Sequence, residues 1–535
     1  MRTELDLILS PQEAGDPSRY AVSAARALGI PSDRVSAVRV LRQSVDARRR
    51  PIAVTLHVQA VVDEPEPLFE EPSFRFGNVA DRPIVLIVGA GPAGLFAALR
   101  LIEAGFRPVI LERGKDVSSR KRDIALISRE HALNPESNYC FGEGGAGTFS
   151  DGKLYTRSKK RGDNRRALEI FRFHGAPAEI LYEAHPHIGS DKLPGIIAAI
   201  RRTILQAGGE IRFETRVDEL VIRDRAIKGV RLQTGDQLDA NAVILATGHS
   251  ARDVYAMLQR LDVQLESKAF AMGVRIEHPQ ALINAIQYHR EPSQIPYLPP
   301  AAYNLVHQAS GRGVYSFCMC PGGFIVPAST APGETVVNGM SPSLRNTPFA
   351  NSGIAVEIRV EDLGDYASSG ALAGLRFQQE LEQTAFRNAG GGQTAPAQRV
   401  TDFVSGKPSH DLPESSYLPG LVASPLHAWL PPSIGARLKE GLLAFDRKMR
   451  GFLTRDAILV GVESRTSSPV RIPRDPATLQ HVTIQGLFPC GEGAGYAGGI
   501  LSSAIDGENC AAAAAAWIAS SPVRETSLCG ESSQS

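Results

Sequence analysis

The residues best suited to binding a charged ligand in this 535-residue sequence form the turn Gly89-Ala90-Gly91-Pro92-Ala93-Gly94. Gly89 permits a tight turn, Gly91 lets the backbone approach a pyrophosphate, and Gly94 lets a helix pack closely against a strand. Pro92 and Ala93 stand where that helix begins, and the free N–H groups of a helix start favour negatively charged phosphates. This spacing predicts a dinucleotide-binding turn.

The elements that must position this turn lie directly on either side of it. Ile84–Val88 is a short, β-branched, apolar run that predicts a strand buried on both faces of a parallel sheet. After the turn, apolar residues recur at helical spacing as far as Gly105, and Arg107–Leu111 predicts a second strand. Glu112 at the end of that strand can accept the ribose hydroxyls of a nucleotide, with Arg113 beside it. These parts fall within about 30 residues, the length of a βαβ unit, which favours nucleotide binding over a flexible glycine-rich loop.

Two later glycine-rich segments are further candidates for ligand contact. Gly142–Gly152, which includes Gly144 and Gly145, is rich in Gly, Ser and Thr, so its backbone can lie against a flat or charged ligand; a disordered loop is the alternative. Thr483–Pro489 predicts a strand that leads into a second glycine-rich turn and then a long helix. The start of that helix offers backbone donors and a positive dipole to an electron-rich ligand. The candidate residues there are Gly491, Glu492, Gly498, Gly499 and Ile500.

Composition limits the remaining possibilities. The chain has 58 Lys and Arg against 57 Asp and Glu, so its net charge of +1 gives no general attraction to nucleic acid or to an anionic membrane. The six cysteines have no framework spacing, which fits a reducing compartment. The N-terminus carries charges where a signal peptide would be apolar, and no run approaches the length of a membrane span. We therefore expect a cytoplasmic protein without stable membrane insertion.

Changes in composition and in the spacing of apolar residues along the chain predict its domains. Residues 1–78 predict a small α/β module with no recognisable catalytic or ligand-binding motif. The sequence does not identify a protein partner for this module. Residues 79–265 contain the nucleotide turn, a βαβ rhythm and a small β meander, and residues 457–520 return to that unit. Between them, residues 266–456 are rich in Pro and Gly and predict short strands of an inserted substrate domain. Residues 521–535 predict a disordered tail.

The inserted region supplies candidates for substrate contact. Cys318 and Cys320 would point to the same face of a strand. Two thiols cannot fill a tetrahedral metal site, so we expect no metal; a buried structural pair and a thiol facing the cleft remain the alternatives. Arg345 and Asn351 are further candidates for the cleft. The sequence singles out no catalytic acid or base.

With these segments in view, the chain resembles FAD-dependent proteins of the glutathione-reductase-type dinucleotide-binding superfamily, and in particular a group of uncharacterised FAD-dependent dehydrogenases. The segments that carry the resemblance span about residues 84 to 508: VGAGPAG (88–94) with Glu112-Arg113, FGEGGAGTFSDGKL (141–154), HIGSDKL (187–193), ILATGHSA (244–251), FCMCPGG (317–323), NGMSPSLR (338–345), VESRTSSPVRI (462–472) and FPCGEGAGYAGGILSSAIDGE (488–508).

The resemblance implies FAD as the cofactor. It places the pyrophosphate over the Gly89–Gly94 turn, the adenosine ribose at Glu112 and an adenine contact at Val217. It makes Thr247 and Gly248 part of an ATG element. It also brings Gly491 and Glu492 to the ribityl and pyrophosphate part, and the helix start at Gly498-Gly499-Ile500 to the N1/C2=O edge of the flavin ring.

The fold class expected from these observations is α/β: a Rossmann-like FAD-binding domain with a parallel sheet and a β meander, split by an inserted α+β substrate domain and preceded by the small N-terminal domain. The expected function is an FAD-dependent oxidoreductase that transfers hydride through flavin N5 to or from a small organic substrate, with NAD(P)H as a transient donor. The alternatives are a flavin-binding sensor or interaction protein, an isoprenoid-type alkene reductase and a monooxygenase.

Overall fold

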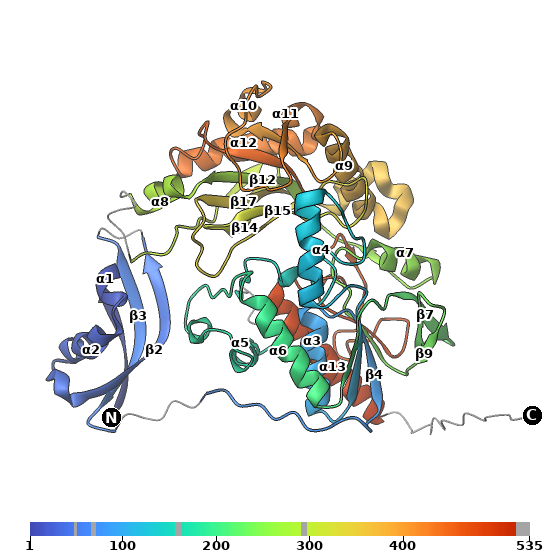
Figure 1. The fold of residues 1–535 in the computed structure, drawn as a ribbon, viewed down its shortest axis with the longest axis horizontal. Coiled ribbons are helices and arrows are strands. Elements are labelled where there is room, and N and C mark those ends of the chain that lie inside the picture. Colours follow the sequence, from blue (N-terminus) through green and yellow to red (C-terminus); the bar gives the residue numbers. More distant parts are fainter. Residues whose placement is uncertain (48–50, 66–70, 156–161, 290–296, 521–535) are drawn as a thin grey trace, which may run out of the picture.

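The computed structural model describes residues 1–47, 51–65, 71–155, 162–289 and 297–520, and its central element is a five-stranded parallel sheet (Figure 1). The strand order is β22-β10-β4-β5-β6. The bounds of these strands are Leu487–Pro489, Val243–Leu245, Ile84–Val88, Arg107–Leu111 and Glu210–Arg212. β4 and β5 therefore have the bounds predicted from the sequence, and β22, near the end of the chain, returns to pair with β10.

Helices cover one face of this sheet and a β meander covers the other. On the helical side lie α3 (Pro92–Glu103), α5 (Asn164–Phe173), α6 (Leu193–Gln206) and α13 (Ile500–Ser520). On the opposite side lie β7 (Val217–Arg223), β8 (Ala226–Leu232), β9 (Gln237–Asp239) and α7 (Arg252–Arg260). α13 packs very closely on α3, because a Cβ at Gly507 would stand only 2.1 Å from the carbonyl oxygen of Ala93. The two helices that follow the glycine-rich turns are thus neighbours.

Residues between the two parts of the parallel sheet build a seven-stranded sheet of their own, in the order β13-β14-β17-β12-β20-β18-β19. The prediction of short strands here is wrong: β12 (Phe270–Pro279) and β17 (Phe349–Ile358) have ten residues each and β14 (Arg312–Cys320) has nine. The sheet also continues past the expected boundary at residue 456, because β20 (Ile458–Glu463) pairs with β12 and β18.

The remaining elements of this unit surround its sheet. The other strands are β13 (Val306–Ala309), β18 (Ala395–Arg399) and β19 (Leu421–Ala423). The helices are α8 (Gln280–Tyr288), α9 (Ala373–Ala389), α10 (Val400–Ser405), α11 (Leu426–Trp429) and α12 (Pro432–Lys448). Two small pairs, β11 (Glu266–Ser267) with β21 (Val470–Arg471) and β15 (Phe324–Pro327) with β16 (Val337–Met340), complete it. α4 (Val117–Glu130) reaches from the parallel-sheet unit to β15, as Figure 1 shows.

The N-terminal module is a three-stranded antiparallel sheet of order β1-β3-β2 with helices on one side. Its elements are β1 (Arg2–Leu9), α1 (Pro11–Ala14), α2 (Tyr20–Leu28), β2 (Val35–Asp46) and β3 (Ala53–Val62). The backbone of Gln43 exchanges hydrogen bonds with Tyr182 and Ala184 of the main body. Ile52 packs in the core of the seven-stranded unit. The module therefore contacts both larger units.

One expectation from the sequence, the disordered tail at 521–535, lies outside the described residues. Within the described part of the chain, none of the helices is long and apolar enough to cross a bilayer.

Candidate functional site

One pocket of about 320 Å³ brings together segments that lie more than 400 positions apart in the sequence. It is bounded by the turn after β4, the glycine-rich loop, the ends of β5 and β10, the meander, the turn after β22, the start of α13 and the β14 region of the seven-stranded sheet. Gly91 and Gly499 therefore face the same cavity. The predicted cofactor residues that line it are Gly89, Gly91, Pro92, Ala93, Glu112, Arg113, Gly145, Val217, Thr247, Gly248, Gly491, Glu492, Gly498, Gly499 and Ile500.

The first turn leaves its backbone open toward the pocket. Gly89 has a φ of 106°, and a Cβ there would lie 2.4 Å from the carbonyl oxygen of Ala246. Gly91 precedes α3, whose first N–H groups lack partners within the helix. Gly94 does not line the pocket, and it has the packing role that its place in the turn predicts. A Cβ there would lie 2.0 Å from the Gly89 carbonyl oxygen, so Gly94 serves the close packing of helix and strand.

The glycine-rich loop meets this turn face to face. Gly145, with a φ of 60°, lies so close that a Cβ on it would stand 3.1 Å from the Cα of Gly91. Gly144 packs against Thr148 and does not line the pocket. The loop is ordered by Arg120, a fully buried residue whose guanidinium donates to the backbone carbonyls of residues 138, 139, 142 and 143. Burial lowers the pKa of Arg120 to about 10, so the side chain remains a cation at neutral pH.

Glu112 is fixed by backbone amides before any ligand contact. Its carboxylate accepts hydrogen bonds from the N–H groups of Ala90 (2.8 Å), Gly114 (2.9 Å) and Gly142 (3.0 Å). A carboxylate has about four acceptor positions, so one remains for a ribose hydroxyl. Arg113 stacks 4.3 Å from the centre of the Phe141 ring, a pocket residue that the sequence reasoning did not single out.

The far end of the pocket is formed by an irregular strand. β14 contains a bulge between Phe317 and Cys320, where Cys318 adopts a φ of 44° and its side chain is exposed in the pocket. Backbone strain of this kind in a non-glycine residue costs about 1–3 kcal/mol and persists only where surrounding groups hold it. The holding group is Arg275, which is fully buried and donates to the Cys318 carbonyl (2.8 Å) while it pairs with Glu463 (2.6 Å).

The two thiols differ in their surroundings. Desolvation by the surrounding pocket walls raises the pKa of the Cys318 thiol to about 12, so this group is a neutral thiol and a poor nucleophile at pH 7. Cys320 is buried, touches the pocket and lies near the Cys318 carbonyl oxygen at 3.1 Å. Of the two sequence alternatives, a thiol facing the cleft describes Cys318, and a buried structural cysteine describes Cys320.

The other two substrate candidates lie outside the pocket lining. Asn351 is fully buried and its side-chain oxygen accepts a hydrogen bond from Arg275 (2.7 Å), so it is part of the core of the seven-stranded sheet. Arg345 pairs with Asp151 (2.9 Å) behind the pocket wall. Lys153 lines the pocket and presents a cation there; the sequence reasoning missed it because an isolated lysine gives no signal of its own.

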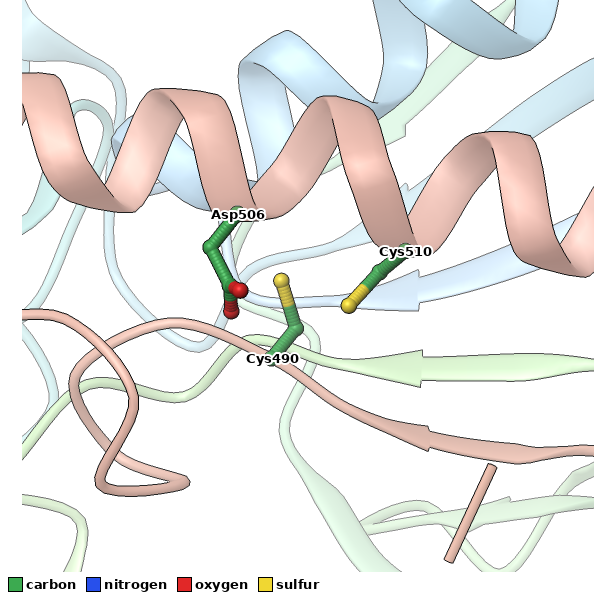
Figure 2. A group of neighbouring side chains, drawn as sticks. All are labelled: Cys490, Asp506 and Cys510. Carbon is green, nitrogen blue, oxygen red and sulfur yellow. The ribbon is translucent and has the colours of Figure 1, made fainter. Parts of the chain in front are cut away.

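The turn after β22 is supported by a buried cluster, whose side chains point toward one another between α13 and the strand end in Figure 2. The ligand atoms of Cys490, Asp506 and Cys510 all lie within 4.8 Å of one another. Arg474 already occupies this cluster: it pairs with Asp506 (2.6 Å) and donates to the sulfur of Cys510 (3.2 Å). Asp506 also accepts a hydrogen bond from the Gly491 N–H (2.7 Å). The cluster therefore fixes the position of the Gly491 turn, and a metal ion would have to displace the Arg474 guanidinium.

These features fit a long, anionic cofactor that touches both ends of the pocket. Two helix starts and two glycine-rich loops meet there, and a Cβ at Gly248, Gly498 or Gly499 would meet no other atom within 4 Å.

Residues 269–466 match the family described as FAD-dependent protein, C-terminal domain-like, and residues 83–130 match an FAD binding domain. Residues 1–61 match a domain of unknown function.

Relatives extend these matches. An uncharacterized protein of Clostridium beijerinckii is 41% identical over 499 residues, which make up 90% of this chain and 92% of the relative. Thiamine thiazole synthase of Aeropyrum pernix is 28% identical over 185 residues, 32% of this chain and 56% of that enzyme. Similar solved structures include the flavin-dependent brominase Bmp2 (13% identity, 82% of this chain and 79% of that one, TM-score 0.36) and CtdE in complex with FAD (11%, 82% and 84%, TM-score 0.30). The identity to the Clostridium protein covers nearly the full length of both chains, and together with the domain matches it means that this chain belongs to the family of FAD-dependent proteins that carry this C-terminal domain.

Proposed function

We propose that the protein is an oxidoreductase that holds FAD in the pocket described above and uses it on a small organic substrate. The observation that carries the proposal is the meeting of two distant segments: the turn after β4 and the start of α13 line one cavity. FAD, when bound, supplies hydride transfer at its N5 atom. The seven-stranded unit closes the far end of the pocket and is proposed as the inserted substrate domain.

Each segment has a proposed task in this assignment. Glu112 offers its remaining acceptor position to the adenosine ribose, and the backbone around Gly91 and Gly145 receives the pyrophosphate. The start of α13 carries roughly half a positive charge, which would favour negative charge at the N1/C2=O edge of the flavin ring. NAD(P)H is proposed as a transient electron donor.

The first experiment tests cofactor binding with a substitution that the fold tolerates. Gly91 has a φ of −73°, and a Cβ there would meet its nearest neighbour at an ordinary 3.9 Å, so Gly91→Ala should fold normally. The new methyl group would stand between the turn and the pyrophosphate, so we expect at least a tenfold weaker affinity for FAD. The control is Gly195→Ala on α6, where a Cβ meets nothing within 4 Å and which does not line the pocket.

Flavin absorbance of the purified proteins and titration of the flavin-free proteins with FAD give the result. A wild-type protein that is colourless and does not bind added FAD would defeat the proposal. Stopped-flow mixing with NADH, NADPH and a panel of metabolites then tests the redox role. Flavin that no donor reduces would leave a binding protein and not an oxidoreductase.

A further inference from the structure

One wall of the substrate end is the short segment of residues 151–155, in which Gly152 has a φ of 70° and Lys153 forms a β-bridge with His187. It is held by backbone hydrogen bonds from Leu154 N–H to the Pro186 carbonyl (2.8 Å) and from Ile188 N–H to the Gly152 carbonyl (3.0 Å). Side chains alternate along an extended backbone, so Leu154 is buried in the core while Lys153 and Tyr155 line the pocket. The position of Lys153 is therefore fixed by the backbone.

The ammonium group of Lys153 has limited compensation for its charge. It donates to the carbonyl oxygen of Met319 in the β14 bulge and lies 3.5 Å from Asp151. Asp151 is held more closely by Arg345, at 2.9 Å, so this group of one acid and two bases has a net charge of +1. Among the described residues, no second carboxylate forms an ion pair with Lys153. An ammonium carries three N–H donors, which leaves one for a ligand.

This charge faces the interior of the pocket. Accessible surface remains on 37% of the Lys153 side chain. Burial lowers the pKa of Lys153, and the neighbouring Asp151 carboxylate opposes this; the pKa is raised overall, so the group is a cation at neutral pH. A cation with a free donor in a confined site favours an anion, because charge-assisted hydrogen bonds are stronger there than in water.

Apart from Asp151, which is paired with Arg345, the pocket lining near Lys153 includes uncharged and aromatic side chains. Phe317 and Tyr155 contribute rings to the pocket lining, and Cys318 contributes a neutral thiol. A ligand that fits this end has an apolar or aromatic body and one negative group.

We propose that Lys153 binds the carboxylate of the substrate, which makes organic acids with an apolar or aromatic body the substrate class of this site. Asp151 and the Met319 carbonyl act as positioning groups that aim the ammonium into the pocket. The inference rests on the proposed function, since it takes the remainder of the pocket to be filled by FAD.

The test compares three probes of the same size on the FAD-loaded protein: benzoate, benzamide and benzylamine. Dissociation constants are measured by isothermal titration calorimetry and by changes in flavin absorbance. We expect benzoate to bind about 10- to 100-fold more tightly than benzamide, the gain typical of a hydrogen bond to a charged group, and benzylamine to bind more weakly than either. Lys153→Met should abolish the preference for benzoate, and Lys153→Arg should retain most of it. Lys192→Met, an exposed position outside the pocket, is the matched control.

The outcomes separate this inference from the proposed function. A yellow wild-type protein that binds benzamide as tightly as benzoate, or that binds no probe, would overturn the assignment of Lys153 while leaving FAD binding intact. Persistence of the benzoate preference in a yellow Lys153→Met protein would overturn it equally. Loss of flavin from the wild-type protein would instead contradict the proposed function, and calorimetry on that flavin-free protein would still report the carboxylate preference of Lys153.

Discussion

Replacing Glu492 by glutamine tests the electrostatics of the cofactor pocket. Glu492 lies in the turn after β22 and lines the pocket, and no hydrogen bond or ion pair joins its carboxyl group to another described residue. Burial raises the pKa of Glu492 to about 7 from an ordinary value of 4.5, and the nearby Lys268 lowers it only in part. The carboxyl group therefore keeps its proton well above the pH at which a glutamate in the unfolded chain loses it.

The sign of the effect on stability follows from proton binding. Between pH 4.5 and about 7 the folded protein holds a proton at Glu492 that the unfolded chain has released. The free energy of unfolding therefore falls as the pH rises through this window. The difference of 7 − 4.5 = 2.5 pKa units corresponds to about 3 kcal/mol, an upper value because water in the pocket screens part of the penalty. Glutamine has almost the same shape and no charge, so it removes this loss.

The assay is the urea denaturation of the flavin-free wild-type and Glu492→Gln proteins at a series of pH values. We expect the two proteins to be equally stable near pH 4.5 and the variant to be more stable, by up to about 3 kcal/mol, above pH 7. Other carboxyl groups titrate in both proteins and cancel in the difference. Parallel pH profiles, with a constant difference between the two proteins, would refute the reasoning, since they would mean that Glu492 ionises normally in the folded state.

Two further predictions concern the β14 bulge. Glu463→Gln leaves the guanidinium of the fully buried Arg275 without its anion and should lower the free energy of unfolding by about 3–5 kcal/mol in denaturation experiments. The control is Glu361→Gln: the side chain of Glu361 is 64% exposed, so its replacement should change the free energy of unfolding by less than about 1 kcal/mol. Similar losses of stability in both variants would contradict the argument. Cys318, whose pKa is about 12, should be alkylated by iodoacetamide slowly at pH 7 and about tenfold faster for each pH unit up to 10. Mass spectrometry follows the reaction, and a rate that levels off near pH 8.5, as for an ordinary cysteine, would show that the pocket walls do not raise the pKa of this thiol.

Features with local signals could be predicted from the sequence. β4 and β5 occupy the predicted residues because each is a short, largely apolar run close to a glycine. The convergence of Gly91 and Gly499 on one pocket was also predicted, from two strand–turn–helix signals and the resemblance to FAD-dependent proteins. In these cases the residues that form the element also carry the information about it.

The long strands of the inserted unit could not be read in the same way. Nine of the ten residues of β12 are buried, yet its sequence FAMGVRIEHP contains Arg275, Glu277 and His278. These polar side chains interrupt the apolar pattern, and they are tolerated in the core only because partners from distant segments satisfy them, such as Glu463 for Arg275 and Ser416 for Glu277. The sequence shows the polar residues but not the partners, so it predicts short strands.

The same dependence on distant partners explains why the substrate end of the pocket was only partly foreseen. Cys318 reaches the pocket because its carbonyl is bound by Arg275 from β12, and Arg275 in turn needs Glu463 from β20. The next carbonyl in the bulge, that of Met319, accepts a hydrogen bond from Lys153 in the other unit. Two neighbouring carbonyls are thus fixed by two cations, one from each unit, so the wall that would meet a substrate forms only when the parallel sheet and the seven-stranded sheet are both in place. Chemistry at this end of the pocket therefore depends on the contact between the units as much as on the residues that line it.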